Sequence, residues 1–497
     1  MEDLKSRALR GGFARMCAQA ANFVLRVGSL MVLARLLTPR EYGLFGMVTA
    51  ITGVFALFRD AGLSTVTIQR PTISDGQLSA LFWLNLLVGL LLALLCVGAA
   101  PLLVAFYGEP QLFWVTIVTG CAFPLNAAGI QHSALLQRHM RFGALAAIDV
   151  AAQICSVTMG IAMALLGFGY WALVAAALTL PAVTTTGTWS ATRWVPGRPR
   201  GEGEIGSMIR FGGTLTLNSL VVYVAYNVDK LLIGRVWGAD ALGLYGRAYQ
   251  LVNIPTENLN SAVGGVAVSA LSRLQDDPGR FKNYFLRAYS LVLAMTIPVT
   301  TACACFAEDI IVVVLGQQWT NAAGVFTILA PTIVAFGVLN PMVWLLFSTG
   351  RVSRSLHMAL VIAPTVILGY VIGLPYGPLG VALGYSAAMT ILIAPMITWG
   401  LRDTGITVRG YVAVLGPPFL SSLCGAAVGL VVGRLIADAL PAPQRLALEV
   451  GVLSVTYVIV LLSVGGQRSF YYDLARDLLT SWRRQDRPHP SRSDAGS

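Results

Sequence analysis

Long stretches without a charged residue are the feature of this sequence that most restricts its fold. The stretch from Leu86 to Val104 carries no charged side chain, and a bilayer span needs roughly 20 mostly apolar residues. Of the 497 residues, 56% are hydrophobic and only 11% are charged, against about 25% charged in soluble proteins. A transmembrane β-barrel would instead need alternating apolar and polar residues. The sequence therefore predicts an all-α polytopic membrane protein with about 14 transmembrane helices.

The net charge of +11 is typical either of nucleic-acid binding or of basic residues gathered on one side of a membrane. When the N-terminus is placed in the cytoplasm, 24 of the 34 Lys and Arg residues fall in inner segments, and only Arg40 and Arg445 fall in outer loops. Basic residues concentrate in cytoplasmic loops of membrane proteins. We therefore expect both termini to be cytoplasmic and no nucleic acid to be bound.

Apolar runs and turn signals divide the chain into spans and segments. The predicted spans cover residues 11–37, 43–63, 80–106, 113–136, 144–166, 169–191, 211–237, 241–272, 288–314, 323–349, 356–374, 378–400, 410–437 and 446–466. We interpret 1–192 as an N-terminal six-helix lobe, 193–210 as a cytoplasmic linker, 211–402 as a C-terminal six-helix lobe, 403–466 as two extra helices (13 and 14), and 467–497 as a cytoplasmic amphipathic and disordered tail.

The two lobes resemble each other in sequence. A shift of 200 residues aligns seven identical residues between positions 10 and 46, the densest being Gly43-Leu44-Phe45-Gly46 on Gly243-Leu244-Tyr245-Gly246. Chance coincidence of small and apolar residues is the alternative. Because six spans, an even number, separate the two starts, the repeats would be parallel, and parallel repeats place a substrate site between the halves. The sequence predicts two such lobes around a central cavity.

Small residues recur at every fourth position in two predicted spans. Gly425, Gly429 and Gly433 form one such ridge, and Gly380 with Gly384 forms another. Ridges of this kind let helix backbones approach closely in membranes. We expect both ridges to serve helix packing.

Polar residues inside the first predicted span form a cationic stripe. Arg15, Asn22 and Arg26 are 7 and 11 residues apart, which places them within roughly 20° of one another on a helix. Arg26 lies roughly 22 Å from the cytoplasmic end at about 1.5 Å per residue. Charged residues at such depth are costly and usually functional, so Arg26 is the strongest single candidate, whereas Arg15 could also reach the inner surface by snorkelling.

A second group of polar residues occupies the first two spans of the C-terminal lobe. The candidates for substrate binding there are Asn218, Tyr226, Gln250 and Asn253, and the candidates for ion coupling are Asp229, Lys230 and Glu257. The alternatives are an Asp229–Lys230 pair that only neutralises itself and hydrogen bonding between helices without a ligand. Asp149 lies close to the inner boundary, where local pairing is the favoured interpretation.

The sequence offers no support for bound metals, cofactors or catalysis. Seven cysteines and four histidines are scattered without ligand spacing, and no nucleotide-binding fingerprint is present. Outer loops are short and lack histidine, which disfavours an intramembrane glycan polymerase or ligase. We expect neither a cofactor nor an enzymatic activity.

Several strings resemble the bacterial polysaccharide-transport family, which includes Wzx-type flippases and shares a superfamily with multidrug exporters of the MATE type and lipid II flippases. They are DAGLSTVTIQR (60–70), LFWLNLLVGLLLA (81–93), FYGEP (106–110), LQRHMRF (136–142), NVDKLLIGR (227–235) and LGLYGRAYQL (242–251). The resemblance covers most of residues 1–400 and specifies the family better than the substrate.

This resemblance implies a flippase that moves undecaprenyl-pyrophosphate-linked oligosaccharide from the inner to the outer leaflet of the bacterial cytoplasmic membrane. It also implies two six-helix lobes around a central cavity, with membrane lipid and possible polymerase and glycosyltransferase machinery as partners. Arginines suit pyrophosphate because the guanidinium presents forked donors. A MATE-type small-molecule antiporter and a lipid II flippase remain the alternatives.

Overall fold

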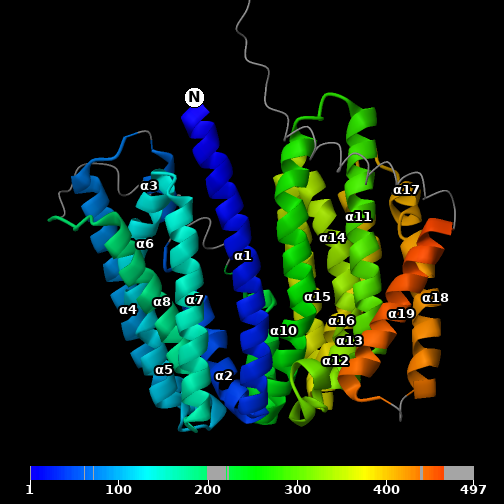
Figure 1. The fold of residues 1–497 in the computed structure, drawn as a ribbon, viewed down its shortest axis with the longest axis horizontal. Helices are drawn as coiled ribbons and strands as arrows, with labels where there is room; N and C mark the ends of the chain where they lie inside the picture. The colour runs from blue at the N-terminus through cyan, green and yellow to red at the C-terminus, as the bar shows by residue number, and fades with distance from the viewer. Residues whose placement is uncertain are drawn as a thin grey trace, which may run out of the picture. The chain divides into compact units, whose positions relative to one another are not determined.

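The computed structural model describes residues 2–60, 62–70, 72–198, 220, 223–436 and 440–463, all as helices and short connections without a strand. The first helices are α1 (Glu2–Leu36), α2 (Pro39–Ala56), α3 (Leu63–Gln69), α4 (Asp75–Tyr107), α5 (Leu112–Gly120), α6 (Ala122–Arg138), α7 (Phe142–Leu165), α8 (Trp171–Thr192) and α10 (Val228–Ser272). The later ones are α11 (Pro278–Cys305), α12 (Ala307–Val314), η1 (Gln317–Trp319), α13 (Ala322–Leu329), α14 (Pro331–Ser348), α15 (Val352–Gly373), η2 (Leu374–Tyr376), α16 (Gly377–Gly400), α17 (Val408–Ala413), α18 (Gly416–Ile436) and α19 (Ala442–Ser463) (Figure 1). The predicted all-helical class is confirmed.

Ten stretches of the described chain are long and apolar enough to cross a membrane. One of them, Ser353–Gly400, has 48 residues, which at about 1.5 Å per residue is more than twice the thickness of a hydrocarbon core. It contains α15 and α16, separated by η2 and by the left-handed Gly377, whose φ is 76°. The total of about 14 spans stays a prediction, since most of 211–222 and all of 464–497 lie outside the described residues.

The chain forms two compact units. The first comprises residues 1–252, 310–329 and 356–392, and the second comprises 253–309, 330–355 and 393–497. The predicted lobe boundaries stay a prediction, and the linker beyond residue 198 and the tail lie outside the described residues.

Helix α7 is the packing centre of the first part of unit 1. It runs beside α1 and α8, and α6 packs against both α8 and α4 (Figure 1).

Two helices of unit 1, α2 and α4, begin with a reciprocal cap. In α2 the Thr38 hydroxyl accepts from the Glu41 N–H while the Glu41 carboxylate accepts from the Thr38 N–H, and Ser74 with Gln77 repeats the arrangement at α4. Such boxes satisfy N–H groups that the first helical turn leaves without partners.

Two glycines of the aligned motifs meet in a reciprocal contact inside unit 1. A Cβ at Gly43 would overlap the carbonyl oxygen of Ala239, and a Cβ at Gly243 would overlap that of Pro39. Positions 39 and 239 are related by the same 200-residue shift as 43 and 243. A two-fold relation between the two segments requires this reciprocity, so the contact supports the predicted repeat.

Backbone conformation extends the resemblance beyond the aligned motifs. Left-handed residues recur 208 to 210 residues apart at helix ends: Gly108 and Gly316, Met140 and Gly350, Gly167 and Gly377, Arg193 and Asp403. A helix break recurs at the same spacing, since Cys121 separates α5 from α6 and Ala330 separates α13 from α14. The sequence predicts 113–136 and 323–349 as single spans and does not indicate these breaks.

Helix α11 is the centre of unit 2, where it contacts α14, α18 and α19. The α18–α19 pair packs closely along the predicted glycine ridge (Figure 1). A Cβ at Gly425 would lie 2.8 Å from the Leu453 carbonyl oxygen, and one at Gly433 would overlap the Glu449 carboxyl. In unit 1 the glycine pair of α16 meets glycines of α15 in the same way, with Gly384 against Gly369 and Gly380 against Gly373. The prediction that the ridges serve packing is confirmed.

Candidate functional site

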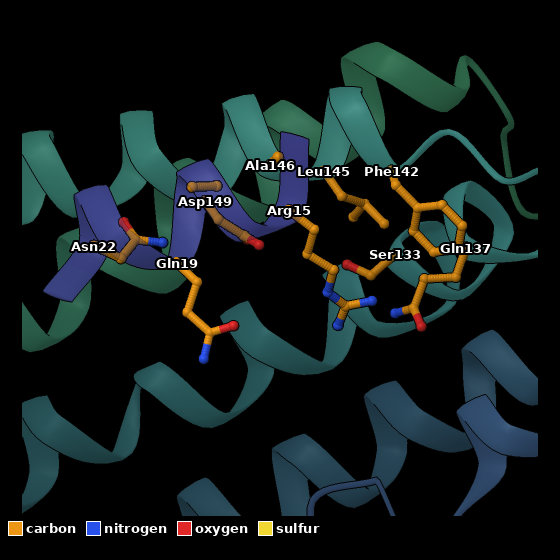
Figure 2. A pocket seen from close by; sticks show the side chains of 10 residues that line it. Arg15, Gln19, Asn22, Ser133, Gln137, Phe142, Leu145, Ala146 and Asp149 are labelled. Carbon is orange, nitrogen blue, oxygen red and sulfur yellow. The ribbon is translucent and has the colours of Figure 1, made fainter. Parts of the chain in front are cut away.

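A polar cavity of about 340 Å³ lies inside unit 1 between α1, α6 and α7. Its walls combine one cationic, one anionic, several amide and hydroxyl, and a few apolar side chains. They are Arg15, Ala18, Gln19 and Asn22 from α1, Ser133 and Gln137 from α6, and Phe142, Leu145, Ala146 and Asp149 from α7 (Figure 2). The volume falls within the range of about 300 to 1,000 Å³ that is usual for ligand pockets.

Helical spacing brings these side chains to a common face. Arg15, Gln19 and Asn22 follow one another at four and three residues along α1, the spacing at which side chains share one side of a helix. Ser133 and Gln137 are also four apart on α6. Because α7 packs against α1, the polar face of α1 is directed at Asp149 and Phe142 rather than at an apolar interior.

Arg15 is the cationic centre of the cavity. Its side chain is exposed, and its guanidinium carbon lies 5.9 Å from the centroid of the Phe142 ring. Figure 2 shows it directed toward Ser133 and Gln137. Asp149 is close enough for its charge to interact with that of Arg15. No ion pair joins these two residues, both of which the structure describes. Arg15 thus keeps donors available for a ligand while a carboxylate balances its charge.

Asn22 contributes an acceptor with no partner. Its Oδ1 is buried and makes no hydrogen bond within the described structure. A buried polar atom without a bond costs about 1 to 3 kcal/mol, so such an atom in a cavity wall is suited to a ligand donor.

Two of the three predicted α1 residues line the cavity. Arg15 and Asn22 line the cavity, whereas Arg26 has an exposed side chain and is not part of the wall. The proposed role of Arg26 stays a prediction. Asp149 was interpreted as a local pairing residue near the membrane boundary, and no spacing along the sequence could have placed it opposite Arg15, because that depends on which helices are neighbours.

The second predicted group centres on Asp229, which is fully buried in unit 1. Its Oδ2 accepts a 2.8 Å hydrogen bond from the Tyr245 hydroxyl and its Oδ1 accepts one of 2.8 Å from the Lys230 backbone N–H. The Lys230 ammonium instead donates to Asn227 Oδ1 at 2.7 Å and lies 5.4 Å from the centroid of the Tyr249 ring. The Asp229 carboxylate is therefore held by the Tyr245 hydroxyl and the Lys230 backbone amide, and the Lys230 ammonium acts on it only from a distance.

A row of aromatic rings begins at Tyr245, the tyrosine that donates to this carboxylate. Tyr245 stacks on Tyr249 with centroids 6.0 Å apart, and Tyr249 lies 6.0 Å from Tyr385, which lies 5.5 Å from Tyr370. Tyr245, Tyr370 and Tyr385 are almost completely buried. The Asp229 carboxylate therefore lies beside a group of buried tyrosines.

The remaining predicted residues are not part of the cavity wall. Tyr226 precedes α10 and is partly buried, and Gln250, Asn253 and Glu257 follow along α10, of which Glu257 is exposed. None of these four lines the α1–α6–α7 cavity. Asn218 lies outside the described residues.

Comparisons with known proteins identify the family and the fold. The model of a family described as polysaccharide biosynthesis protein matches residues 32–324, more than half of the chain. The lipopolysaccharide biosynthesis protein WzxC of Escherichia coli strain K12 is 25% identical over 450 residues, which cover 86% of this chain and 88% of WzxC.

Two solved structures resemble the fold. The lipid II flippase MurJ in an inward closed conformation gives a TM-score of 0.73 at 14% identity, covering 93% of this chain and 99% of MurJ. An inward-facing multidrug resistance transporter of the MATE family gives 0.64 at 13% identity, covering 77% of this chain and 94% of that transporter. At such identities the likeness concerns the fold alone. The chain is thus a multi-pass helical membrane protein that belongs to the polysaccharide biosynthesis family of Wzx-type polysaccharide transporters, as the sequence resemblance predicted.

Proposed function

We propose that this protein is a flippase that moves undecaprenyl-pyrophosphate-linked oligosaccharide from the inner to the outer leaflet of the bacterial cytoplasmic membrane by alternating access. The cargo would be a repeat unit of an exopolysaccharide, capsule or O-antigen, delivered by glycosyltransferases and passed to a polymerase. The proposal includes about 14 spans, two parallel six-helix lobes and two cytoplasmic termini. Family membership and the polar cavity with Arg15 support it.

The chemistry of the cavity carries the proposal. Arg15 supplies forked donors for phosphate oxygens, and the amides of Gln19, Asn22 and Gln137 suit sugar hydroxyls. The Phe142 ring adds a face on which a sugar could rest. At about 340 Å³ the cavity has room for part of a headgroup, so the remaining sugars would need space opened by movement of the lobes. The prenyl tail would stay in lipid.

Transport needs a driving force, and two sources are available. An inside-negative potential favours outward movement of an uncompensated negative charge by about 2.3 kcal/mol per 100 mV. The buried Asp229 site could add coupling to a proton or a cation, with Lys230 and Glu257 as further candidates. Asp229 is the strongest of the three, since it is fully buried and its carboxylate has no direct side-chain cation partner within the described chain.

Replacement of Arg15 tests the proposal. We expect Arg15→Ala to reduce polymer export about tenfold or more, the loss of one charge-assisted hydrogen bond being worth roughly 1.5 to 3 kcal/mol, and lipid-linked repeat units to accumulate on the inner leaflet. Arg15→Lys should lie between this variant and the wild type. Met16→Ala, at a neighbouring position that is 72% exposed, is the matched control and should export normally. Normal export by Arg15→Ala, at normal protein level, would remove the cavity from the mechanism.

One observation favours a second candidate, a MATE-type antiporter for small cations. Asp149 gives the cavity a carboxylate that could receive a cationic compound, and the fold is shared with a MATE transporter. Asp149→Asn separates the two functions, because it should abolish cation transport but leave glycan export largely intact. Drug efflux that depends on Asp149, with unchanged export in Arg15→Ala, would favour the antiporter.

A further inference from the structure

A buried carboxyl pair in unit 2 is balanced by one arginine among the described residues. Asp309, in the first turn of α12, is 7% exposed, and Glu449 on α19 is 5% exposed. Arg445, one turn before Glu449, donates from Nε to Asp309 Oδ2 at 2.8 Å and from Nη2 to Asp309 Oδ1. This fork occupies both oxygens of Asp309 and neutralises one of the two carboxylates.

In the described structure, one carboxylate oxygen of Glu449 has no hydrogen-bond donor. Its Oε2 is buried and has no hydrogen-bond partner within the described structure, and its carboxyl lies within hydrogen-bonding reach of Asp309. Two ionised carboxylates offer only acceptors to each other. The two carboxylates can therefore lie this close only if a proton or a cation lies between them.

The space around Glu449 is shaped by a glycine. A Cβ at Gly433 on α18 would overlap Glu449 Oε1, so the third glycine of the ridge leaves the room that the carboxyl occupies. Two other charged groups that the structure describes here do not compensate it: Glu308 on α12 is exposed and anionic, and Arg434 on α18 is exposed. An unpaired charge inside an apolar helix pair costs several kcal/mol, and such groups are usually neutralised instead.

We infer that Glu449 and Asp309 form a proton-binding site in which Glu449 carries the proton and donates it to Asp309 in a hydrogen bond. The site ties α19 and α18 to Asp309 at the start of α12. It belongs to unit 2, shares no residue with the cavity of the proposed function in unit 1, and does not depend on the cargo. Deprotonation would leave two adjacent carboxylates with one arginine. The contact between α19 and α12 should then weaken.

The pH dependence of unfolding tests the inference. Because the folded state would bind one more proton than the unfolded state, the unfolding equilibrium constant should rise with pH, by up to about tenfold per pH unit, once the pH exceeds the ordinary glutamate pKa of about 4.3. Glu449→Gln keeps the shape and the donor of the protonated form, so it should fold and lose this dependence. Glu308→Gln removes an exposed carboxylate beside Arg445 and should keep it.

Infrared spectroscopy of the full chain gives a second readout that needs no unfolding. The wild type and Glu308→Gln should show the carbonyl band of a buried, protonated carboxylic acid, and Glu449→Gln should lack it. The same band in Glu449→Gln, or its absence from the wild type at every pH, would overturn the assignment. Loss of the band on addition of Na⁺ at constant pH would also overturn it, because the site would then prefer a metal cation to a proton.

Discussion

The hydrogen bond between Tyr245 and Asp229 allows the energetics of the buried site to be tested with the loss of a single oxygen atom. Tyr245→Phe removes the hydroxyl that donates to Asp229 Oδ2 at 2.8 Å and keeps the ring that stacks on Tyr249. Since Asp229 is fully buried, no water replaces the lost donor. Oδ2 is then left without a partner.

Two estimates bound the free-energy cost of losing this hydrogen bond. A buried acceptor left without its donor costs about 1 to 3 kcal/mol in soluble proteins, and more when it is charged. Hydrogen bonds between membrane helices average about 0.6 kcal/mol with a maximum of about 1.7, because the unfolded state in lipid also finds partners. We expect Tyr245→Phe to lower the free energy of unfolding by about 1 to 2 kcal/mol.

Tyr107→Phe is the matched control. The Tyr107 hydroxyl is buried without a hydrogen-bond partner in the described structure, so its removal relieves an unsatisfied group and should be neutral or slightly stabilising. The assay is equilibrium unfolding of the purified protein in mixed detergent micelles. Equal stability of the two variants would refute the reasoning, since it would mean that Asp229 gains nothing from the Tyr245 donor.

Two further changes test the helix crossing and the first cap of unit 1. Gly43→Ala should destabilise the fold by about 1 to 3 kcal/mol, because the added methyl group meets the Ala239 carbonyl, which cannot rotate away. The control Gly246→Ala, where a Cβ would meet nothing within 4 Å, should gain up to about 1 kcal/mol of stability from helix propensity. Equal melting temperatures of the two variants would contradict the expected overlap at Gly43. Thr38→Ala should cost about 1 kcal/mol by removing one half of the reciprocal cap with Glu41, a loss that thermal unfolding would measure and that an unchanged melting temperature would disprove.

The helical class and the repeat could be predicted because both are written in local patterns. Apolar runs of bilayer length give the helices, and the motif that begins at Gly43 aligns with the one at Gly243 without any knowledge of contacts. The structure adds that these glycines meet the opposite segment, near Ala239 and Pro39. The sequence prediction does not contain the break at Ala330, although Pro331 follows it, since hydropathy alone does not register where a helix is interrupted.

The candidate sites were predicted only in part, because helix periodicity fixes which residues share a face but not what the face meets. The spacing of Arg15 and Asn22 identified a polar face of α1, and both line the cavity. Asp149 joins them only because α7 packs against α1. Tyr245 reaches Asp229 across 16 residues of α10 and the non-helical Gly238, a bend that no periodic pattern describes.

Local charge balance distinguishes the three polar sites. The cavity combines one arginine with one carboxylate that are not joined in an ion pair, so its guanidinium can turn to an anionic ligand without leaving a buried charge unpaired. At Asp229 the carboxylate relies on neutral donors, and at Glu449 the Oε2 atom has no hydrogen-bond partner within the described structure. The last two sites are the places where a change of protonation would alter packing most, because a buried charge without a partner costs several kcal/mol. An exporter built on this plan would bind its anionic cargo at α1 and respond to protons elsewhere. Arg15→Ala should therefore impair export without changing the pH dependence of stability. Glu449→Gln should remove the pH dependence of stability without impairing export.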